Sequence, residues 1–153
     1  MPKNADAKMK TESEIFTSHS EKDTKNCGHE FAGTLSGGNV ILLFGDLGAG
    51  KTVFVRGVCE ALGISGVRSP SFTLINEYES PDGLLVIHAD LYRLDSDGVS
   101  ATGLDEYAGD DSAVLFVEWP DRWTNPPANS VRIYFDSTSE NERTIRIERV
   151  ISR

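Results

Sequence analysis

The residues whose types and spacing could carry out chemistry begin at Gly45, where the sequence reads Gly-Asp-Leu-Gly-Ala-Gly-Lys-Thr. The spacing Gly-x-x-x-x-Gly-Lys-Thr is that of a P-loop, which binds the phosphates of a nucleotide. Its glycines allow a tight backbone turn that points successive N–H groups at the phosphates. In this pattern Lys51 reaches the β- and γ-phosphates and the Thr52 hydroxyl ligates Mg²⁺. The segment therefore predicts a site for a nucleotide and Mg²⁺.

Two acidic residues that follow apolar runs could hold the magnesium ion or its water. Residues 114–117 are all apolar and lead directly into Glu118, and a second apolar run, which begins at Leu84, leads to Asp90. A P-loop enzyme needs such a carboxylate at the tip of a strand beside the P-loop. Glu118 fits this pattern better, which leaves Asp90 to position or deprotonate the attacking water. The opposite division of roles stays open.

The choice of nucleotide rests on a motif that the chain lacks. Ras-type GTPases read guanine with an Asn/Thr-Lys-x-Asp motif after the P-loop, and no lysine follows Lys51. ATP is therefore favoured. Two alternatives to an ATPase remain: a small-molecule kinase, and a nucleotide-gated interaction module without significant turnover. Small-molecule kinases usually carry an arginine-rich lid, whereas residues 94–121 contain no basic residue.

Four further residues give weaker signals. Thr73 ends the segment Ser-Pro-Ser-Phe-Thr, which could sense the γ-phosphate as a switch loop or could simply lead into a strand. Arg93 could neutralise phosphate charge or pair with a nearby acid. Trp119 could line the nucleotide site, although packing is the commoner use of such a residue. We interpret His88 as a strand residue rather than a catalyst.

The elements that must position these residues alternate between strands and helices. Residues 40–44 are apolar throughout, which indicates a parallel strand buried on both faces. Residues 51–62 follow as a helix, and Ser-Pro-Asp-Gly at 80–83 is a turn signal that predicts an antiparallel pair of strands. The other expected elements are a short helix within 95–107, a central strand at 114–117 and a hairpin from 131–135 and 144–151. The pattern predicts an α/β fold: a P-loop NTPase-like three-layer sandwich, with a mixed central sheet, helices on both faces and a C-terminal β-hairpin.

The N-terminal segment differs from the rest in composition. Residues 1–13 are polar and charged and are expected to form a disordered tail, followed by a single P-loop ATPase domain over 14–153. A short strand is expected at 14–18. Ser20 can cap a helix that runs to about Leu35, because its apolar residues recur every four positions.

Charge and hydropathy exclude some classes of partner. The formal net charge is −9 and the isoelectric point is about 4.7, which argues against direct binding to DNA or RNA phosphates. The first residues have no apolar run behind them that would indicate a signal peptide, and no apolar stretch is long enough to cross a membrane. Cys27 and Cys59 have no metal-binding spacing and are expected to be reduced. We therefore expect a cytoplasmic protein.

Five segments, in this order, resemble the TsaE (YjeE) family, small bacterial ATPases of threonylcarbamoyladenosine tRNA modification. They are the P-loop, Ser-Pro-Ser-Phe-Thr at 69–73, His-Ala-Asp-Leu-Tyr-Arg at 88–93, Gly-Leu-Asp-Glu-Tyr at 103–107 and Val-Glu-Trp-Pro at 117–120. The resemblance covers about residues 14–150, and Asp-Leu-Tyr-Arg together with Glu-Trp-Pro makes it specific. Ser71 stands where many members have threonine, and the first helix contains Asn-Cys-Gly at 26–28.

The resemblance implies a function in forming N6-threonylcarbamoyladenosine (t6A) at position 37 of tRNAs that read ANN codons. The family hydrolyses ATP weakly on its own and acts on a complex of TsaB and TsaD, so tRNA would be reached only through those partners. By position, Thr52 and Glu118 would serve the metal, and Lys51, Asp90 and Glu118 would serve catalysis. The implied nucleotide contacts are Asp46, Leu47, Gly48, Ala49, Gly50, Lys51, Thr52, Val53 and the switch-like Thr73.

Overall fold

A mixed β-sheet organises the chain. The structure is a computed structural model that describes residues 10–46, 48–68 and 74–151. The strands are β1 (Lys10–Ser18), β2 (Val40–Phe44), β3 (Ile75–Glu79), β4 (Leu85–Asp90), β5 (Ala113–Glu118), β6 (Val131–Ser137) and β7 (Arg143–Ile151). They form a seven-stranded sheet in the order β1-β7-β6-β2-β5-β4-β3. The helices are α1 (Glu21–Phe31), α2 (Lys51–Ala61), α3 (Ser96–Ala101) and α4 (Leu104–Ala108).

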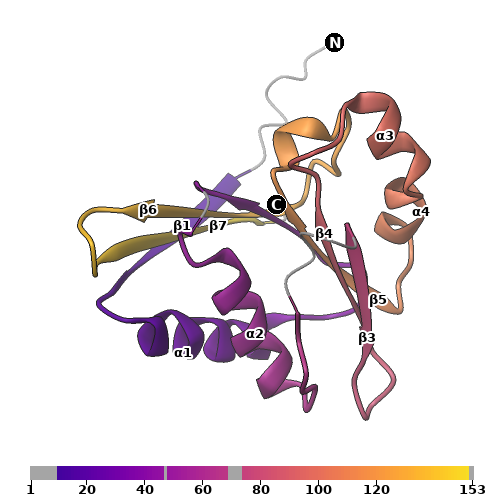
Figure 1. Cartoon of the computed structure of the whole chain (residues 1–153). Coiled ribbons are helices and arrows are strands. Elements are labelled where there is room, and N and C mark those ends of the chain that lie inside the picture. The colour runs from indigo at the N-terminus through magenta and orange to yellow at the C-terminus, as the bar shows by residue number, and fades with distance from the viewer. Residues whose placement is uncertain (1–9, 47, 69–73, 152–153) are drawn as a thin grey trace.

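The expected α/β architecture is confirmed. Strand β2 runs parallel to β5 and β6, and β4 runs parallel to β5. Strand β3 pairs antiparallel with β4, and β6 pairs antiparallel with β7 in the terminal hairpin. Helices α1 and α2 lie on one face of the sheet and α3 and α4 on the other (Figure 1). The sheet is therefore the middle layer of three.

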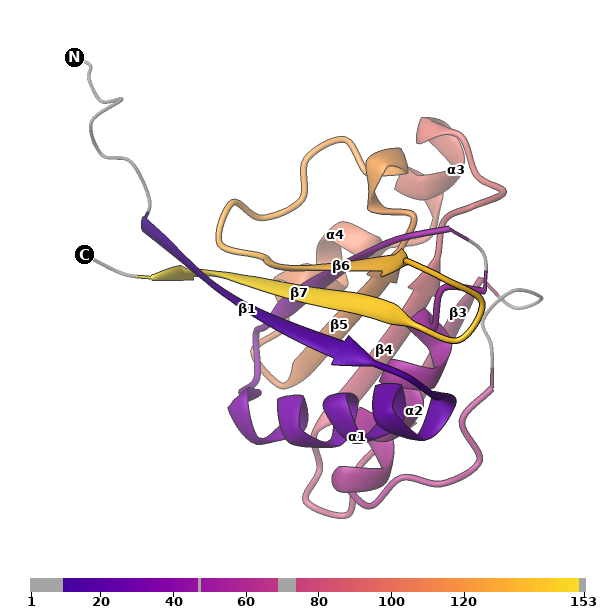
Figure 2. The ribbon, with the colours of Figure 1, turned by 90° about the vertical axis from the view of Figure 1, so that its left-hand side faces the viewer.

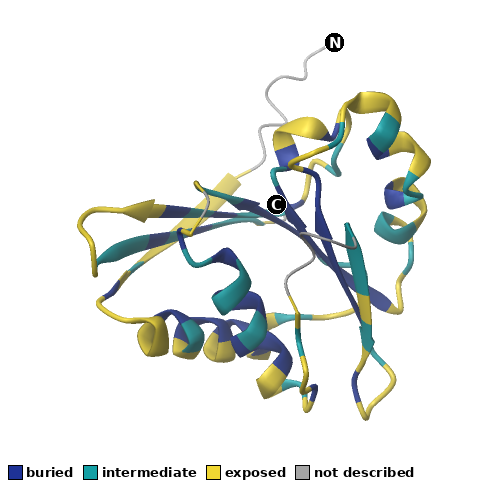
Figure 3. Ribbon diagram, in the orientation of Figure 1, coloured by how far each residue is buried: buried dark blue, intermediate teal, exposed yellow. Residues whose placement is uncertain are grey.

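Strand β2 shows why the central strands read as continuous apolar runs. Successive side chains of a strand point to opposite faces. Ile41 and Leu43 belong to the core on the side of α1 and α2, while Val40 and Leu42 belong to the core on the side of α3 and α4. Both faces are thus covered, and Figure 3 shows the buried residues concentrated along these central strands.

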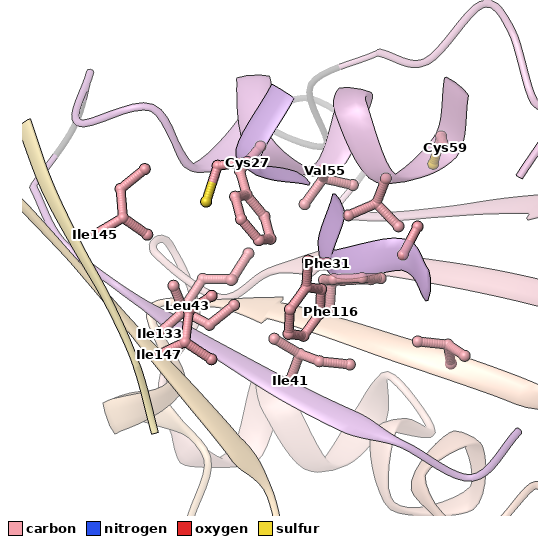
Figure 4. Close-up of a cluster of buried hydrophobic side chains, with 14 of the residues drawn as sticks. Cys27, Phe31, Ile41, Leu43, Val55, Cys59, Phe116, Ile133, Ile145 and Ile147 are labelled. Carbon is pink, nitrogen blue, oxygen red and sulfur yellow. The ribbon is translucent and has the colours of Figure 1, made fainter. Parts of the chain in front are cut away.

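The core beneath α1 and α2 packs aromatic and aliphatic side chains from the helices against those of the sheet, among them Phe31, Phe116 and Ile133 (Figure 4). The ring of Phe54 lies 5.4 Å from that of Phe31 and 5.5 Å from that of Phe135. The two helices approach closely at Gly28, where a Cβ atom would stand 2.1 Å from the carbonyl oxygen of Phe54. Gly28 lowers helix propensity by about 1 kcal/mol relative to alanine, and the close contact explains its presence.

The opposite face is covered by two short helices instead of the one that the sequence suggested. Gly103, with a positive φ of 79°, separates α3 from α4. Asp95 caps α3 by accepting a hydrogen bond from the N–H of Gly98 at 2.8 Å. Trp123 completes this layer, and its Nε1 donates to Asp105 Oδ1 at 2.9 Å. Each helix is shorter than two turns, so tertiary packing rather than propensity holds it.

The predicted extent of the N-terminal tail is wrong. Residues 10–13 belong to β1, which pairs antiparallel with β7 from Lys10 opposite Ile151 to Ser18 opposite Arg143 (Figure 2). Backbone hydrogen bonds to β7 hold this polar segment, so its composition alone did not reveal a strand. The part of the tail prediction that covers residues 1–9 lies outside the described residues.

The first helix begins as expected and ends early. Ser20 caps α1 and accepts a hydrogen bond from the N–H of Asp23 at 3.0 Å. The helix ends at Phe31, and a 3₁₀ turn at Ala32–Thr34 follows. In the described ranges no helix combines the length and apolar character that crossing a membrane requires.

Candidate active site

The glycine-rich turn lies between β2 and α2, as the sequence predicts. Gly45, Gly48 and Gly50 all have positive φ angles, which residues other than glycine rarely adopt. A Cβ at Gly45 would also stand 2.8 Å from the carbonyl oxygen of Phe135, so the backbone passes close to β6. The turn ends at Lys51, the first residue of α2, and places the helix N-terminus at the mouth of the loop. Leu47 lies outside the described residues.

Lys51 is held inside the loop. The residue is 4% exposed, and Nζ donates to the carbonyl oxygen of Gly45 at 2.5 Å. Nζ also lies 4.6 Å from the centre of the Trp119 ring. Burial lowers the pKa of Lys51, while the negative charges of Glu118 and Asp90 oppose that shift. The ammonium group is therefore positioned by a carbonyl contact that a phosphate oxygen can replace.

The two predicted acids meet at one edge of the sheet. Asp90 ends β4 and Glu118 ends β5, and the parallel register sets them opposite each other. Because the carboxyl ends of parallel strands share an edge, both acids lie beside the turn that follows β2. The Thr52 hydroxyl donates to Glu118 Oε2 at 3.2 Å. The structure thus brings Lys51, Thr52, Asp90 and Glu118 to one place.

His88 joins this group, although the sequence suggested only a strand residue. It does lie in β4, and its Nε2 is 2.6 Å from Glu118 Oε2. The imidazole is fully buried, and Nδ1 has no hydrogen-bond partner in the described structure. Alternation along the strand places His88 on the same face as Asp90, because the two are two residues apart. The contact with Glu118 depends in addition on the pairing of β4 with β5.

The pKa values of the two carboxyl groups are shifted in opposite directions. Burial raises the pKa of Asp90, and the charge of Glu118 adds to the shift, although the N–H of Tyr92 donates to Asp90 Oδ1 at 3.0 Å and opposes it. Burial alone would also raise the pKa of Glu118. The hydrogen bond with His88, the charge of Lys51 and the hydrogen bond from Thr52 together hold the pKa of Glu118 below its usual value. Glu118 is thus the more firmly ionised acid, and Asp90 is the better proton acceptor.

A cavity of about 310 Å³ connects the acids with the glycine-rich turn. Its lining residues are Glu21, Thr24, Gly48, Gly50, Lys51, Thr52, Val53, Asp90, Glu118 and Arg143. Asp46 and Ala49 belong to the turn but not to this lining, and Thr73 with the rest of segment 69–73 lies outside the described residues.

Sequence reasoning missed three of the lining residues. Arg143, the first residue of β7, donates from one guanidinium nitrogen to the carbonyl oxygen of Gly48 at 3.1 Å. Glu21 and Thr24 come from the first turns of α1. No local motif marks these positions, because only the packing of α1 and the pairing of β7 bring them to the P-loop. Arg93 is exposed and does not line the cavity.

The residues present fit a magnesium ion. A threonine hydroxyl and a carboxylate supply the hard oxygen ligands that Mg²⁺ prefers, and those of Thr52 and Glu118 are already in contact. In the described part of the chain, no cluster of three or more His, Cys, Asp or Glu residues could hold a metal by itself. A metal here would depend on phosphate and water oxygens for its remaining ligands, as Mg²⁺ at nucleotide sites does.

Comparison with known proteins gives a consistent result. The family model described as "Threonylcarbamoyl adenosine biosynthesis protein TsaE" matches residues 18–145. A tRNA threonylcarbamoyladenosine biosynthesis protein TsaE from Aquifex aeolicus is 43% identical over 133 residues, and the match covers 85% of this chain and 92% of that protein. The protein of the same name from Bacillus subtilis is 38% identical, and the match covers 86% of this chain and 83% of that protein. The crystal structure of Bacillus subtilis YdiB superposes with a TM-score of 0.74 at 32% identity, covering 94% of this chain and 90% of that one.

Proposed function

Because this chain belongs to the TsaE family of threonylcarbamoyl adenosine biosynthesis proteins, we propose that it binds and hydrolyses ATP with Mg²⁺ as an accessory subunit in forming t6A at position 37 of tRNAs that read ANN codons. The observation that carries the proposal is the cavity that joins a P-loop to two strand-end carboxyl groups. The names of the relatives supply the pathway, and the cavity supplies the chemistry.

Phosphate binding follows from the loop and the helix behind it. The backbone N–H groups of the P-loop and the positive end of the α2 dipole favour an anion at the mouth of the loop. Lys51 would exchange its contact with the Gly45 carbonyl oxygen for a β- or γ-phosphate oxygen. Val53, in the first turn of α2, lines the same cavity.

Thr52 and Glu118 would hold the metal, since both offer oxygen atoms at the same point of the cavity. When bound, Mg²⁺ would neutralise negative charge that develops on the transferred phosphoryl group. Glu118 remains ionised at neutral pH because its pKa is held low, so its carboxylate is ready to act as a ligand.

Asp90 would act on the attacking water. Its raised pKa brings it closer to the range in which a carboxylate accepts a proton effectively. The hydrogen bond from the Tyr92 N–H fixes its orientation at the end of β4. This assignment agrees with the division of roles in which Glu118 serves the metal and Asp90 serves the water.

The proposed partners are TsaB and TsaD, with tRNA bound through them. A net charge of −9 makes this chain a poor ligand for the tRNA backbone, so the partners would supply the phosphate contacts. The kinase and the nucleotide-gated module remain the competing predictions. Transfer of labelled phosphate from ATP to a metabolite would favour the kinase, and ATP-dependent association without turnover would favour the module.

A pull-down with purified TsaB and TsaD tests the proposal. We expect association that depends on ATP, and faster phosphate release by the complex than by this chain alone. Lys51→Ala should lose both effects, whereas Lys25→Ala, which removes a surface ion pair with Glu60 at 2.7 Å, should lose neither. Equal recovery with and without ATP, together with an unstimulated ATPase, would overturn the proposed role.

A further inference from the structure

The most deeply buried polar group of the site is the imidazole of His88, which has no solvent exposure. We infer that His88 is a positioning residue, whose ring fixes the Glu118 carboxylate in the orientation that faces Thr52 and the cavity. The inference rests on the proposed function, because it gives Glu118 a metal to bind.

Two donors converge on one oxygen of Glu118. His88 Nε2 lies 2.6 Å from Oε2, and Thr52 Oγ1 lies 3.2 Å from the same atom. One donor comes from strand β4 and the other from helix α2, so two separate elements hold the carboxylate. Carboxylates that bind metals are commonly oriented by such hydrogen bonds, and losing one typically costs about 10- to 100-fold in metal affinity or activity.

The sheet register explains how His88 reaches Glu118. In the parallel pair, His88 lies opposite Phe116 and Asp90 lies opposite Glu118. His88 and Asp90 point to the same face of β4, since they are two residues apart. The imidazole therefore lies beneath both acids, on the side of the sheet that carries α2.

The hydrogen-bond inventory fixes the direction of this contact. An ionised carboxylate can only accept, so Nε2 must carry the hydrogen that it donates to Glu118. Nδ1 has no partner in the described structure. With the hydrogen on Nε2, Nδ1 can be an unpartnered acceptor, which a protein interior tolerates better than an unpartnered N–H group. Within the described structure the ring therefore makes one hydrogen bond, and its partner is Glu118.

Two substitutions separate positioning from packing. His88→Met keeps an unbranched, similarly long side chain but removes the donor, whereas His88→Gln keeps an amide N–H that can reach Glu118. We expect His88→Met to raise the Mg²⁺ concentration needed for half-maximal effect by about 10- to 100-fold. Binding of a fluorescent ADP analogue in EDTA should be unchanged, because the P-loop contacts remain. His88→Gln should restore most of the Mg²⁺ response.

Three readouts make the comparison decisive: the ADP-analogue affinity with and without Mg²⁺, the kcat and KM of ATP hydrolysis, and the melting temperature. Positioning predicts a lower kcat and a higher Mg²⁺ requirement for His88→Met, with little change in KM at saturating Mg²⁺. Ile87→Val is the matched control, because Ile87 is equally buried in β4 but belongs to the core on the opposite face of the sheet. It should lower the melting temperature without changing the Mg²⁺ requirement.

The outcomes separate a failure of the proposed ATPase function from a failure of the role inferred for His88. If the wild-type chain binds no nucleotide, the proposed function fails and the inference fails with it. If the wild type binds and hydrolyses MgATP and His88→Met needs no more Mg²⁺ than the wild type, only the inference fails. Should His88→Met not fold, His88→Asn takes its place, since its amide is too short to reach Glu118 and the same Mg²⁺ comparison with His88→Gln applies.

Discussion

Replacing Gly28 by alanine tests whether α1 and α2 pack as closely as the structure shows. On helix propensity alone the change should stabilise the protein by about 1 kcal/mol, because glycine is the poorer helix former. The packing predicts the opposite, since the new Cβ would stand 2.1 Å from the carbonyl oxygen of Phe54 and 3.2 Å from the backbone nitrogen of Val58.

The size of the effect follows from the atom that is in the way. A backbone carbonyl within α2 cannot rotate aside as a flexible side chain can, so the helices must separate. Overpacking a well-packed interior costs about 1 to 3 kcal/mol, and the upper end applies to a backbone clash. After the propensity gain, the net loss is about 2 kcal/mol. For a chain of this length that corresponds to a melting temperature lower by about 4 to 8 °C.

Urea denaturation followed by circular dichroism measures the difference, and Gly33→Ala supplies the control. Gly33 lies in the 3₁₀ turn after α1, and a Cβ there would meet nothing within 4 Å. We expect Gly33→Ala to be as stable as the wild type or slightly more stable. A Gly28→Ala variant at or above wild-type stability would refute the reasoning on this interface.

Three further predictions follow from the site and the core. Asp90→Asn should raise the melting temperature at pH 7, because a raised pKa means that the ionised form of Asp90 destabilises the folded state. This gain over the wild type should shrink as the pH falls through the pKa of Asp90 in the folded protein toward its usual value of 3.8. An acid titration of both proteins checks this, and no gain at pH 7 would contradict it. Arg143→Ala should weaken nucleotide binding roughly tenfold by removing the contact with the Gly48 carbonyl oxygen, while Arg149→Ala, at the far end of the same strand, should leave the affinity measured by calorimetry unchanged. Burial raises the pKa of Cys27 and of Cys59 to about 12, so both thiols should resist a disulfide reagent at pH 8 until urea unfolds the chain; rapid labelling of the native protein would count against the packing of α1 and α2.

Local sequence patterns predicted the features that depend on residues adjacent in the sequence, such as a strand buried on both faces, a turn, or an acid at the end of an apolar run. The apolar run at 40–44 is β2 with the same boundaries, and the turn at 80–83 joins antiparallel strands as expected. Asp90 and Glu118 could be placed together because each ends an apolar run, and the ends of parallel strands meet at one edge.

The features that sequence reasoning missed depend on contacts between distant segments. Residues 10–13 look like a polar tail, and only their pairing with β7 makes them a strand. Gly28 looks like a weak point of a helix until α2 is seen against it. Arg143 reaches the P-loop because of the sheet order, which no local pattern encodes. His88 was visible by strand alternation, but its partner in the neighbouring strand was not.

The central claim is that one cavity both binds and hydrolyses ATP. Nucleotide binding and phosphate release, measured on the same samples with Mg²⁺ and the partner proteins present, test it most directly. We predict that Lys51→Ala loses binding, that Asp90→Asn and Glu118→Gln bind but do not turn over, and that Lys25→Ala matches the wild type. Full hydrolysis by Asp90→Asn and Glu118→Gln, or unchanged ATP binding by Lys51→Ala, would contradict the assignment of this site.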